Sequence, residues 1–325
     1  MASTLSDRRS PAAEQSSPGA PERWPLVSAV VPTRDRPKLL RRAVEAILGQ
    51  HYPGEVECIV VFDQSEPIEI DVELSEGRSL RLVRNQRTPG LAGARNAGAV
   101  VARGDLVAFC DDDDEWLPDK LRLQVEALRA NPAAVAVSSG IWVHYGTRQV
   151  ERVPSQAELT FEQLLRDRVM EVNPCSILVD RTALLERIGL VDEAIPASYG
   201  EDYEWLLRAT RLAPIPIVPR PLVHIHWHAS SFFKGRWQMI VAALTYLLDK
   251  YPEFAQEPRG LARIQGQIAF AHAAAGERAQ ARRMALRTLR HNWRERRAYV
   301  ALAVSLGLMR PATVLRVAHL MGKGV

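Results

Sequence analysis

Cysteine is scarce in this sequence of 325 residues, which has only Cys58, Cys110 and Cys175. Three widely spaced thiols cannot form the framework of a disulfide-stabilised secreted domain. Cys58 and Cys110 lie in apolar, strand-like segments, which indicates buried and reduced thiols. We therefore expect the protein to work in a reducing compartment, the cytoplasm.

Long apolar runs are also missing. No segment reaches the roughly 20 consecutive apolar residues that a membrane-spanning helix needs. The segment Met1–Ala20 is polar and lacks the apolar stretch of a signal peptide, so we expect no secretory leader. Ser, Pro, Ala and charged residues dominate residues 1–25, which is typical of a disordered leader before the first folded domain.

Acidic residues become rare in the last third of the chain. Residues 231–325 hold 16 Lys and Arg against 5 Asp and Glu, a net charge of +11, whereas the remainder has a net charge of −7. Helical periodicity dominates this basic part. We therefore expect a folded domain over residues 26–230 and a basic helical region over residues 231–325.

Three interpretations of the basic region stay open. It forms a helical bundle with a solvated basic face, a docking surface for a protein partner, or a set of helices in peripheral contact with the anionic inner face of the cell membrane. Nucleic acid is not an expected partner, because no nucleic-acid-binding module is recognisable in the sequence.

Apolar, strand-like runs alternate with helical patterns in the first half of the chain. Continuous apolar segments cover Leu26–Val31, Glu57–Phe62 and Leu106–Cys110, and amphipathic periodicity covers Arg36–Gln50. Strands that are apolar on both faces and alternate with helices predict an α/β fold, with a mostly parallel sheet between layers of helices. Ligands of such sheets bind beyond the carboxyl ends of the strands.

Polar residues follow three of these strands at the expected edge of the sheet. Thr33 and Asp35 come after the first strand, Asp63 after the second and Asp111–Asp114 after the third of these runs. Four adjacent carboxylates repel one another and so favour a bound cation. Oxygen ligands suit Mg²⁺ or Mn²⁺, and such an ion would offset the charge of a departing diphosphate. The alternative, a solvated acidic turn before the helix predicted over Leu117–Arg129, stays open.

Several blocks of sequence follow one another in order along residues 27–230. They are Val27–Arg36, Glu57–Asp63, Gly90–Gly98, Gly104–Asp114 and Gly200–Asp202. In this order they resemble the blocks of family-2 inverting glycosyltransferases. The resemblance implies the GT-A fold of nucleotide-diphospho-sugar transferases, which is Rossmann-like, and direct displacement with inversion at the anomeric carbon.

The resemblance also implies roles for particular residues. Asp63 would contact the base of the donor nucleotide, and the other residues on the nucleotide side would be Pro32, Thr33, Asp35, Arg95, Asp111 and Asp112. Asp111 and Asp113 match the Asp-any-Asp motif that holds Mn²⁺ or Mg²⁺, and His226 lies where some members have a further metal ligand. Asp202 matches the catalytic base, and Glu201 would support it.

Asp202 and His226 each have a plain structural explanation as well. Asp202 would enrich the first turn of a helix in negative charge together with Glu201 and Glu204. Histidines that alternate along a strand, as around His226, also occur on ordinary protein surfaces. The sequence departs from the family pattern at Phe62, where many members have a carboxylate.

We therefore expect a cytoplasmic, metal-dependent glycosyltransferase of the hexosyltransferase type. Its donor would be a nucleoside diphosphate sugar, with UDP preferred over GDP or dTDP. Its acceptor would be a hydroxyl of a glycan or lipid-linked glycan in polysaccharide or cell-envelope synthesis. Two alternatives stay open: a catalytically silent binding protein of the same fold, and a sugar-1-phosphate nucleotidyltransferase. The latter would require a glycine-rich basic loop after the first strand, where this chain has Pro32, Thr33, Arg34 and Asp35.

Overall fold

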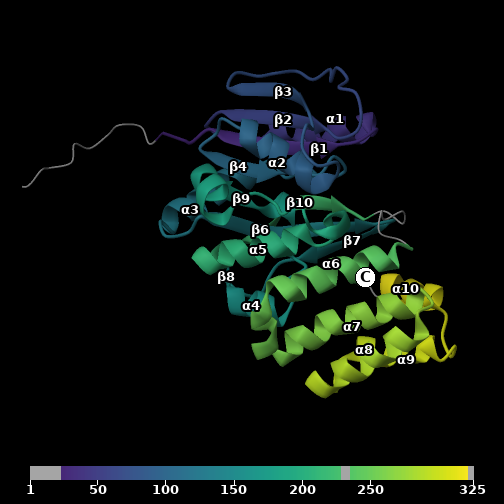
Figure 1. The fold of residues 1–325 in the computed structure, drawn as a ribbon. Coiled ribbons are helices and arrows are strands. Elements are labelled where there is room, and N and C mark those ends of the chain that lie inside the picture. Colours follow the sequence, from purple (N-terminus) through teal and green to yellow (C-terminus); the bar gives the residue numbers. More distant parts are fainter. Residues whose placement is uncertain (1–22, 228–234, 321–325) are drawn as a thin grey trace, which may run out of the picture.

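A ten-stranded mixed sheet forms the centre of the computed structural model, which describes residues 23–227 and 235–320 (Figure 1). The strand order is β3-β2-β1-β4-β9-β6-β10-β5, with β7 beside β6 and β8 beside β10. The strands are β1 (Val27–Thr33), β2 (Val56–Phe62), β3 (Arg78–Arg84), β4 (Leu106–Phe109), β5 (Glu115–Trp116), β6 (Ala136–Tyr145), β7 (Arg148–Arg152), β8 (Glu158–Leu159), β9 (Leu178–Asp180) and β10 (Ile215–His226). The leader predicted over residues 1–25 lies outside the described residues, apart from its last three.

Helices cover the sheet and continue beyond it as a stack (Figure 1). They are α1 (Pro37–Leu48), α2 (Leu91–Val101), α3 (Lys120–Ala130), α4 (Phe161–Arg166), α5 (Glu201–Leu212), α6 (Trp237–Lys250), α7 (Pro258–Ala274), α8 (Arg278–His291), α9 (Arg296–Ser305) and α10 (Pro311–Leu320). The predicted α/β fold is confirmed, with parallel pairing over β3-β2-β1-β4 and mixed pairing from β9 onward. None of the helices that the structure describes combines the length and apolar character needed to cross a bilayer.

Strand β1 explains why the sheet carries helices on both faces. All residues of β1 and β2 are buried. Val30 packs in the same apolar cluster as α2, whereas Ala29 and Val31 pack with the apolar face of α1. Because successive side chains of a strand point to opposite faces, a continuous apolar run needs a covering helix on each side.

Helix α2 packs so closely on the sheet that one of its positions has no room for a side chain. A Cβ atom on Gly98 would lie 2.3 Å from Cγ1 of Val30 and 3.0 Å from Cγ2 of Val61. Ala94 and Ala97 on the same helix are buried too. This close approach brings Arg95 to the edge of the sheet, where it contacts Asp111.

The C-terminal helices extend the core of the sheet domain. Leu244 of α6 and Tyr251 share an apolar cluster with Leu206 of α5, and the Tyr251 hydroxyl donates to Glu204 Oε1 at 2.8 Å. Helix α7 packs against α8 and α9 through a separate, alanine-rich cluster. The boundary predicted at residue 230 falls between the two described ranges and stays a prediction.

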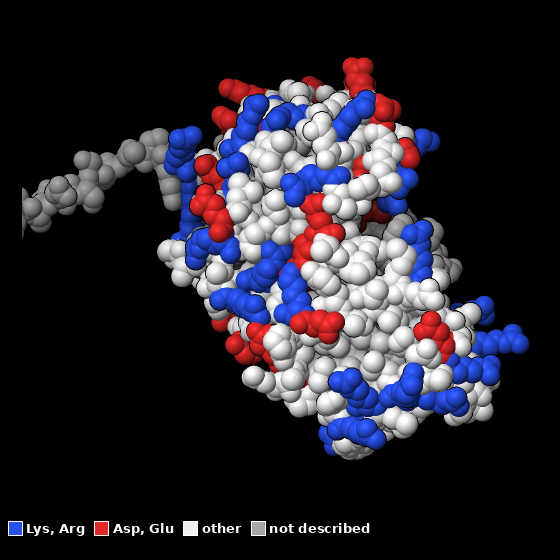
Figure 2. All heavy atoms as spheres, viewed as in Figure 1, with Lys and Arg blue, Asp and Glu red and all other residues white. Residues whose placement is uncertain are grey.

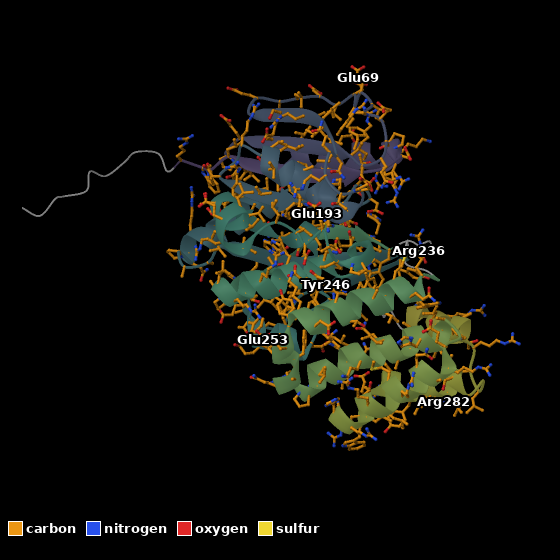
Figure 3. The ribbon with its side chains drawn as sticks, in the orientation of Figure 1. Glu69, Glu193, Arg236, Tyr246, Glu253 and Arg282 are labelled. Atoms are coloured by element: carbon orange, nitrogen blue, oxygen red, sulfur yellow. The ribbon has the colours of Figure 1, made fainter. Side chains whose placement is uncertain are left out.

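A polar contact also joins α6 to the sheet domain. The Tyr246 hydroxyl donates to Asp192 Oδ2 at 2.7 Å, and Lys250 Nζ donates to the same oxygen at 2.5 Å. Glu193, the next residue, accepts from Asn96 Nδ2 of α2 at 2.7 Å. Figure 3 shows Glu193 and Tyr246 at this junction between the sheet and the C-terminal helices.

Candidate active site

The carboxyl ends of β1, β2 and β4 meet at one edge of the sheet, and polar residues predicted there come together. Thr33 and Phe62 are partners in register, and the Asp63 amide donates to the Thr33 carbonyl at 2.9 Å. Thr33 Oγ1 donates in turn to Asp112 Oδ2 at 2.7 Å. One hydroxyl therefore connects the end of β1 to the acidic run after β4.

Asp63 organises the loop that leads into α2. Its carboxylate accepts from the Gly90 amide at 3.0 and 3.1 Å and from Asn85 Nδ2 at 2.8 Å. Gly90 has a φ of 120°, a conformation that favours glycine. Pro32 is buried at the end of β1, whereas Asp35 is exposed. Contact of Asp63, Pro32 and Asp35 with a nucleotide stays a prediction.

The four carboxylates of the acidic run alternate between buried and partly exposed. Asp112 and Asp114 are 6% and 3% exposed, whereas Asp111 and Asp113 reach solvent in part. Burial raises the pKa of Asp112 and of Asp114, and repulsion from Asp111 and Asp113 adds to the rise. Arg36 Nη1 donates to Asp112 at 3.2 Å and to Asp113 at 2.9 Å. A further cation would relieve the remaining repulsion.

The chemistry of the donor atoms at the acidic run fits a hard divalent cation. Ligand atoms of Asp111, Asp114 and Cys175 lie within 4.8 Å of one another. Burial raises the pKa of Cys175, and its thiol donates to Asp114 Oδ2 at 3.2 Å, so the sulfur keeps its proton. Carboxylate oxygens are then the available ligands, and these suit Mg²⁺ or Mn²⁺ better than a thiophilic metal.

Arg95 of α2 joins the acidic run to the start of α5. Its Nη2 donates to Asp111 Oδ1 at 2.7 Å and its Nη1 to Glu201 Oε1 at 2.6 Å. Arg95 as a whole is 2% exposed, so these contacts form away from water. Burial raises the pKa of Glu201 to about 7; Arg95 opposes this rise and the neighbouring Asp202 adds to it. The predicted contact of Arg95 with the donor stays a prediction, because its terminal nitrogens both hold carboxylates.

Asp202 follows Glu201 in the first turn of α5 and pairs with a different arginine. Arg168 Nη2 donates to Asp202 Oδ2 at 2.6 Å. Burial alone would raise the pKa of Asp202, but the charges of Arg168 and Arg95 and the Tyr203 amide hold it below its ordinary value. Asp202 is therefore ionised at neutral pH, which is the state that a general base requires.

Comparison with known proteins assigns this arrangement to a family. Residues 28–186 match the family model described as "Glycosyl transferase family 2". The chain belongs to this family. An uncharacterized glycosyltransferase of Haemophilus influenzae is 26% identical, over 72% of this chain and 80% of its own length. This selects a glycosyltransferase enzyme among the alternatives that the sequence left open.

One named relative and one solved structure describe the likeness further. The Escherichia coli protein "UDP-Glc:alpha-D-GlcNAc-diphosphoundecaprenol beta-1,3-glucosyltransferase WfgD" is 26% identical, over 49% of this chain and 62% of its own length. Residues 1–349 of S. aureus TarS superpose with a TM-score of 0.55 at 16% identity, over 87% of this chain and 90% of that chain. The superposition confirms the GT-A fold.

The family match ends before α5 begins. It covers β1 to β4 and the acidic run but not Glu201 or Asp202. In this glycosyltransferase the two residues are tied to the matched region by Arg95, which contacts Glu201 directly. Their roles therefore depend on the geometry around α5, and they stay predictions.

His226 lies beside the acidic run, but its ring points to Glu115. Its backbone amide donates to Asp114 Oδ1 at 2.9 Å, while its Nε2 lies 3.1 Å from Glu115 Oε1. The ring stacks on His144 with centroids 4.7 Å apart. Burial lowers the pKa of His226, and the nearby His144 lowers it further, so the ring is neutral at pH 7. Neutral imidazole is the form that binds metals, and a ligand role for His226 stays a prediction.

The sequence did not single out three residues that the structure brings to this site. Arg36 lies within the first family block, so its position next to Thr33 and Asp35 was a usable signal. Arg168 and His144 had no such signal. Their partners, Asp202 and His224, are 34 and 80 residues away in the chain, and only the fold brings them together.

Proposed function

We propose that this protein is a metal-dependent inverting glycosyltransferase that moves a sugar from a UDP-sugar donor to a hydroxyl of a glycan or lipid-linked glycan. The observation that carries the proposal is the double contact of Arg95. A single buried guanidinium holds Asp111 of the acidic run and Glu201 of α5, at 2.7 and 2.6 Å. A metal-binding group and a candidate base, Asp202, therefore belong to one connected cluster.

The donor proposal has support from the edge of the sheet and from structural relatives. Thr33, Asp63 and Asp112 are tied to one another at the carboxyl ends of the strands, where nucleotides bind in open α/β sheets. TarS has been solved in complex with UDP and with UDP-GlcNAc. The name of WfgD gives UDP-Glc as its donor. These names support UDP over GDP or dTDP for this chain.

The metal would be held by carboxylate oxygens of Asp111 and Asp113. Both side chains are partly exposed, and the buried Asp114 lies behind them. When bound, Mn²⁺ or Mg²⁺ offsets negative charge on a departing diphosphate. We keep His226 as a further proposed metal ligand. Its ring is neutral, and its backbone amide donates to Asp114 Oδ1, which places the residue beside the acidic run.

The proposed base is Asp202, supported by Glu201. An acceptor hydroxyl loses its proton to the Asp202 carboxylate as its oxygen attacks the anomeric carbon, and the bond to the diphosphate breaks on the opposite face. Glu201 keeps Arg95 in place and adds negative charge beside Asp202. The lipid-linked acceptor in the name of WfgD supports a lipid-linked glycan as the acceptor of this enzyme.

We also propose that the C-terminal helices hold the enzyme at an anionic membrane surface. Helix α8 contains no acidic residue, and its Arg282 and Arg290 flank Leu286, which is 54% exposed. Trp293 and Leu308 are 66% and 76% exposed. Figure 2 shows blue side chains gathered along the rim formed by α8 and α9, and Figure 3 shows Arg282 at that rim pointing outward. Mixed arginine and apolar side chains suit the headgroup region of a bilayer.

The catalytic part of the proposal is tested by following donor cleavage with phosphorus NMR. UDP-, GDP- and dTDP-glucose and UDP-GlcNAc are incubated with the full chain in Mg²⁺ or in EDTA, with water as the acceptor, so that each turnover releases free sugar and nucleoside diphosphate. We expect nucleoside diphosphate to appear from one class of donor only, and only with the metal. Cleavage that continues unchanged in EDTA would contradict the metal-dependent mechanism. Cosedimentation with phosphatidylglycerol vesicles at low salt tests the membrane contact separately.

A further inference from the structure

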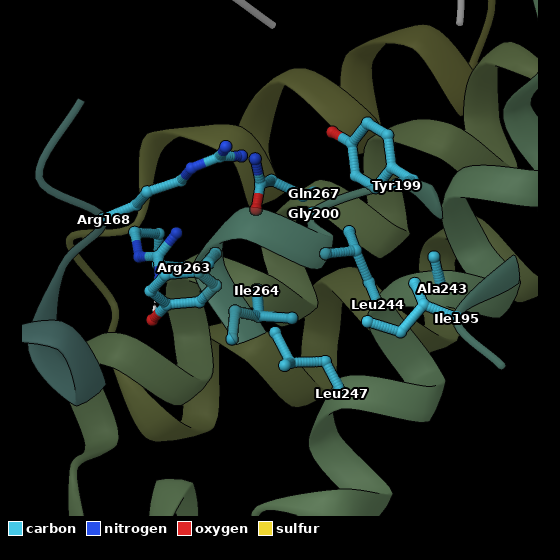
Figure 4. Close-up of a pocket in the computed structure, with 11 residues that line it drawn as sticks. Arg168, Ile195, Tyr199, Gly200, Ala243, Leu244, Leu247, Arg263, Ile264 and Gln267 are labelled. Carbon is cyan, nitrogen blue, oxygen red and sulfur yellow. Dashed lines mark hydrogen bonds between the residues drawn. The ribbon is translucent and has the colours of Figure 1, made fainter. Parts of the chain in front are cut away.

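A narrow pocket lies where the N-terminus of α5 meets α6 and α7, and none of the roles proposed above uses it. Its free volume is about 20 Å³, room for one water molecule or one phosphate oxygen. Arg168, Arg263 and Gln267 lie on one side of this pocket, and Ile195, Ala243 and Leu244 lie on the other (Figure 4). The wall residues come from the segment after α4, the loop before α5 and both C-terminal helices. The pocket therefore exists only because the helical region packs on the sheet domain.

Arg263 of α7 is a buried cation with too few negative partners. It is 8% exposed, and its Nη2 donates to the hydroxyl of Tyr203 at 2.9 Å. Its Nε is buried and has no hydrogen-bond partner among the described residues. That Nε forms an ion pair with Asp167 at 3.5 Å, and because the Asp167 side chain is 60% exposed, solvent weakens this pair. A buried donor without an acceptor is costly, so the site favours an incoming anion.

Arg168 brings a second guanidinium to the same place. The guanidinium centres of Arg168 and Arg263 lie 5.9 and 5.4 Å from the ring centroid of Tyr203. Arg168 also donates to Asp202 at 2.6 Å. When Asp202 takes up a proton it becomes neutral, and Arg168 then loses this buried anionic partner.

We propose that this pocket binds a phosphate or diphosphate group of the acceptor, next to the hydroxyl that Asp202 deprotonates. The inference rests on the proposed role of Asp202. Two guanidinium groups present paired N–H donors that match the oxygens of a phosphate. The acceptor is thus a phosphorylated glycan, either free or attached to a lipid.

The same pocket explains how a carboxylate held by an arginine can serve as a base. In the ion pair with Arg168, Asp202 has a lowered pKa and little tendency to take a proton. An acceptor phosphate competes with Asp202 for Arg168. Weakening that contact raises the proton affinity of Asp202 at the moment when the hydroxyl is in place. Asp202 therefore deprotonates acceptors that carry the phosphate more readily than it deprotonates neutral sugars.

The test is a calorimetric titration of the full chain with two probes, inorganic pyrophosphate and farnesyl diphosphate, in EDTA. Without divalent ions the acidic run repels a diphosphate, and loss of the signal in Arg263→Gln assigns the remaining binding to the pocket. We expect binding in the unmodified chain, at least tenfold weaker binding in Arg263→Gln, and unchanged binding in Arg283→Gln, which alters an exposed arginine of α8.

A second variant covers the case in which Arg263→Gln fails to fold. Gln267→Glu keeps every contact of Arg263 and adds a carboxylate to the pocket, so it should abolish binding by repulsion. Two results would overturn the proposal. One is that pyrophosphate does not bind the unmodified chain; the other is that folded Arg263→Gln and folded Gln267→Glu bind it as tightly as the unmodified chain does. Tighter binding of farnesyl diphosphate than of pyrophosphate indicates a lipid-linked acceptor, and equal binding indicates a free one.

The experiment also separates this inference from the proposed function. Pyrophosphate binding in EDTA needs neither the nucleotide nor the metal. If it fails while metal-dependent UDP binding is intact, the acceptor pocket is wrong and the donor site stands. If pyrophosphate binds as expected but no nucleotide does, the proposed donor function is wrong instead.

Discussion

The two charged regions of this glycosyltransferase are built in opposite ways. At the sheet edge, Asp112 and Asp114 are buried and held by hydrogen bonds from Thr33, Arg36 and the backbone of His226. On α8, arginines such as Arg282 stand exposed on a helix without acidic residues. Buried charges keep their interactions in salt and perturb one another's pKa, whereas exposed charges are screened. The first region is therefore suited to specific chemistry and the second to salt-dependent adhesion.

The largest expected effect belongs to the candidate base in the buried region. Asp202→Asn should lower the rate of sugar transfer about 10³-fold, because an amide cannot accept the proton of the attacking hydroxyl. Binding of UDP with Mn²⁺ should stay within twofold of the unmodified chain. Asp249→Asn, which changes an exposed residue of α6, is the matched control and should alter neither quantity. Near-normal transfer by Asp202→Asn would refute the assignment.

Removing the buried cation should be nearly as damaging, this time to stability. Arg95→Leu leaves Glu201 and Asp111 without their partner and should lower the free energy of unfolding by about 3–5 kcal/mol at pH 8. The loss should be smaller at pH 5.5, because the pKa of Glu201 is already raised to about 7 by burial and a protonated Glu201 needs no cation. Urea unfolding at both pH values measures this. Arg283→Leu on α8 should leave the free energy of unfolding unchanged.

A smaller effect concerns Lys120, a fully buried cation below the acidic run. Its Nζ lies 4.0 Å from the Trp116 ring centroid and donates to Gln124 at 2.8 Å. Burial lowers its pKa to about 7, so the unfolded chain binds this proton more tightly. The free energy of unfolding should therefore increase with pH above 7. In Lys120→Met the increase between pH 7.5 and 9.5 should be smaller by about 2 kcal/mol. An equal pH dependence of the free energy of unfolding in both proteins would contradict the lowered pKa of Lys120. Lys38→Met changes an exposed residue of α1 and is the control.

The smallest effect is expected on the exposed basic face. Replacing Arg282 and Arg290 together by Gln should weaken binding to phosphatidylglycerol vesicles about tenfold at low salt, because each arginine near an anionic surface adds a modest attraction. The difference should shrink at physiological salt. UDP binding should not change. Vesicle binding that is insensitive to both salt and these substitutions would remove the basic face from the proposal.

The sequence predicted the regions where local pattern and structure agree. The apolar runs that became β1, β2 and β4, and the position of Asp111–Asp114 after β4, follow from periodicity and from the rule for parallel sheets. The start of α3 was predicted three residues too early. Leu117 instead donates its amide to Leu222 of β10 at 2.9 Å, because β5 pairs with that distant strand.

Long-range pairing explains what the sequence could not provide. Arg95 was expected to face a ligand, yet its partners Asp111 and Glu201 come from two other elements, and Glu201 is 106 residues away. The pocket around Arg263 requires α7 to pack on α5, which no local pattern records. Residues whose role depends on a partner far along the chain therefore became visible only in the folded structure.

The most direct measurement is a calorimetric titration of UDP, GDP and dTDP into the full chain, each with and without Mn²⁺. We predict that UDP binds only when the metal is present and that Asp113→Ala abolishes this binding while the protein stays folded. Two results would contradict the claim that the acidic run at the sheet edge is the donor site. One is that no nucleotide binds the folded chain in Mn²⁺; the other is that UDP binds equally well without the metal and in Asp113→Ala.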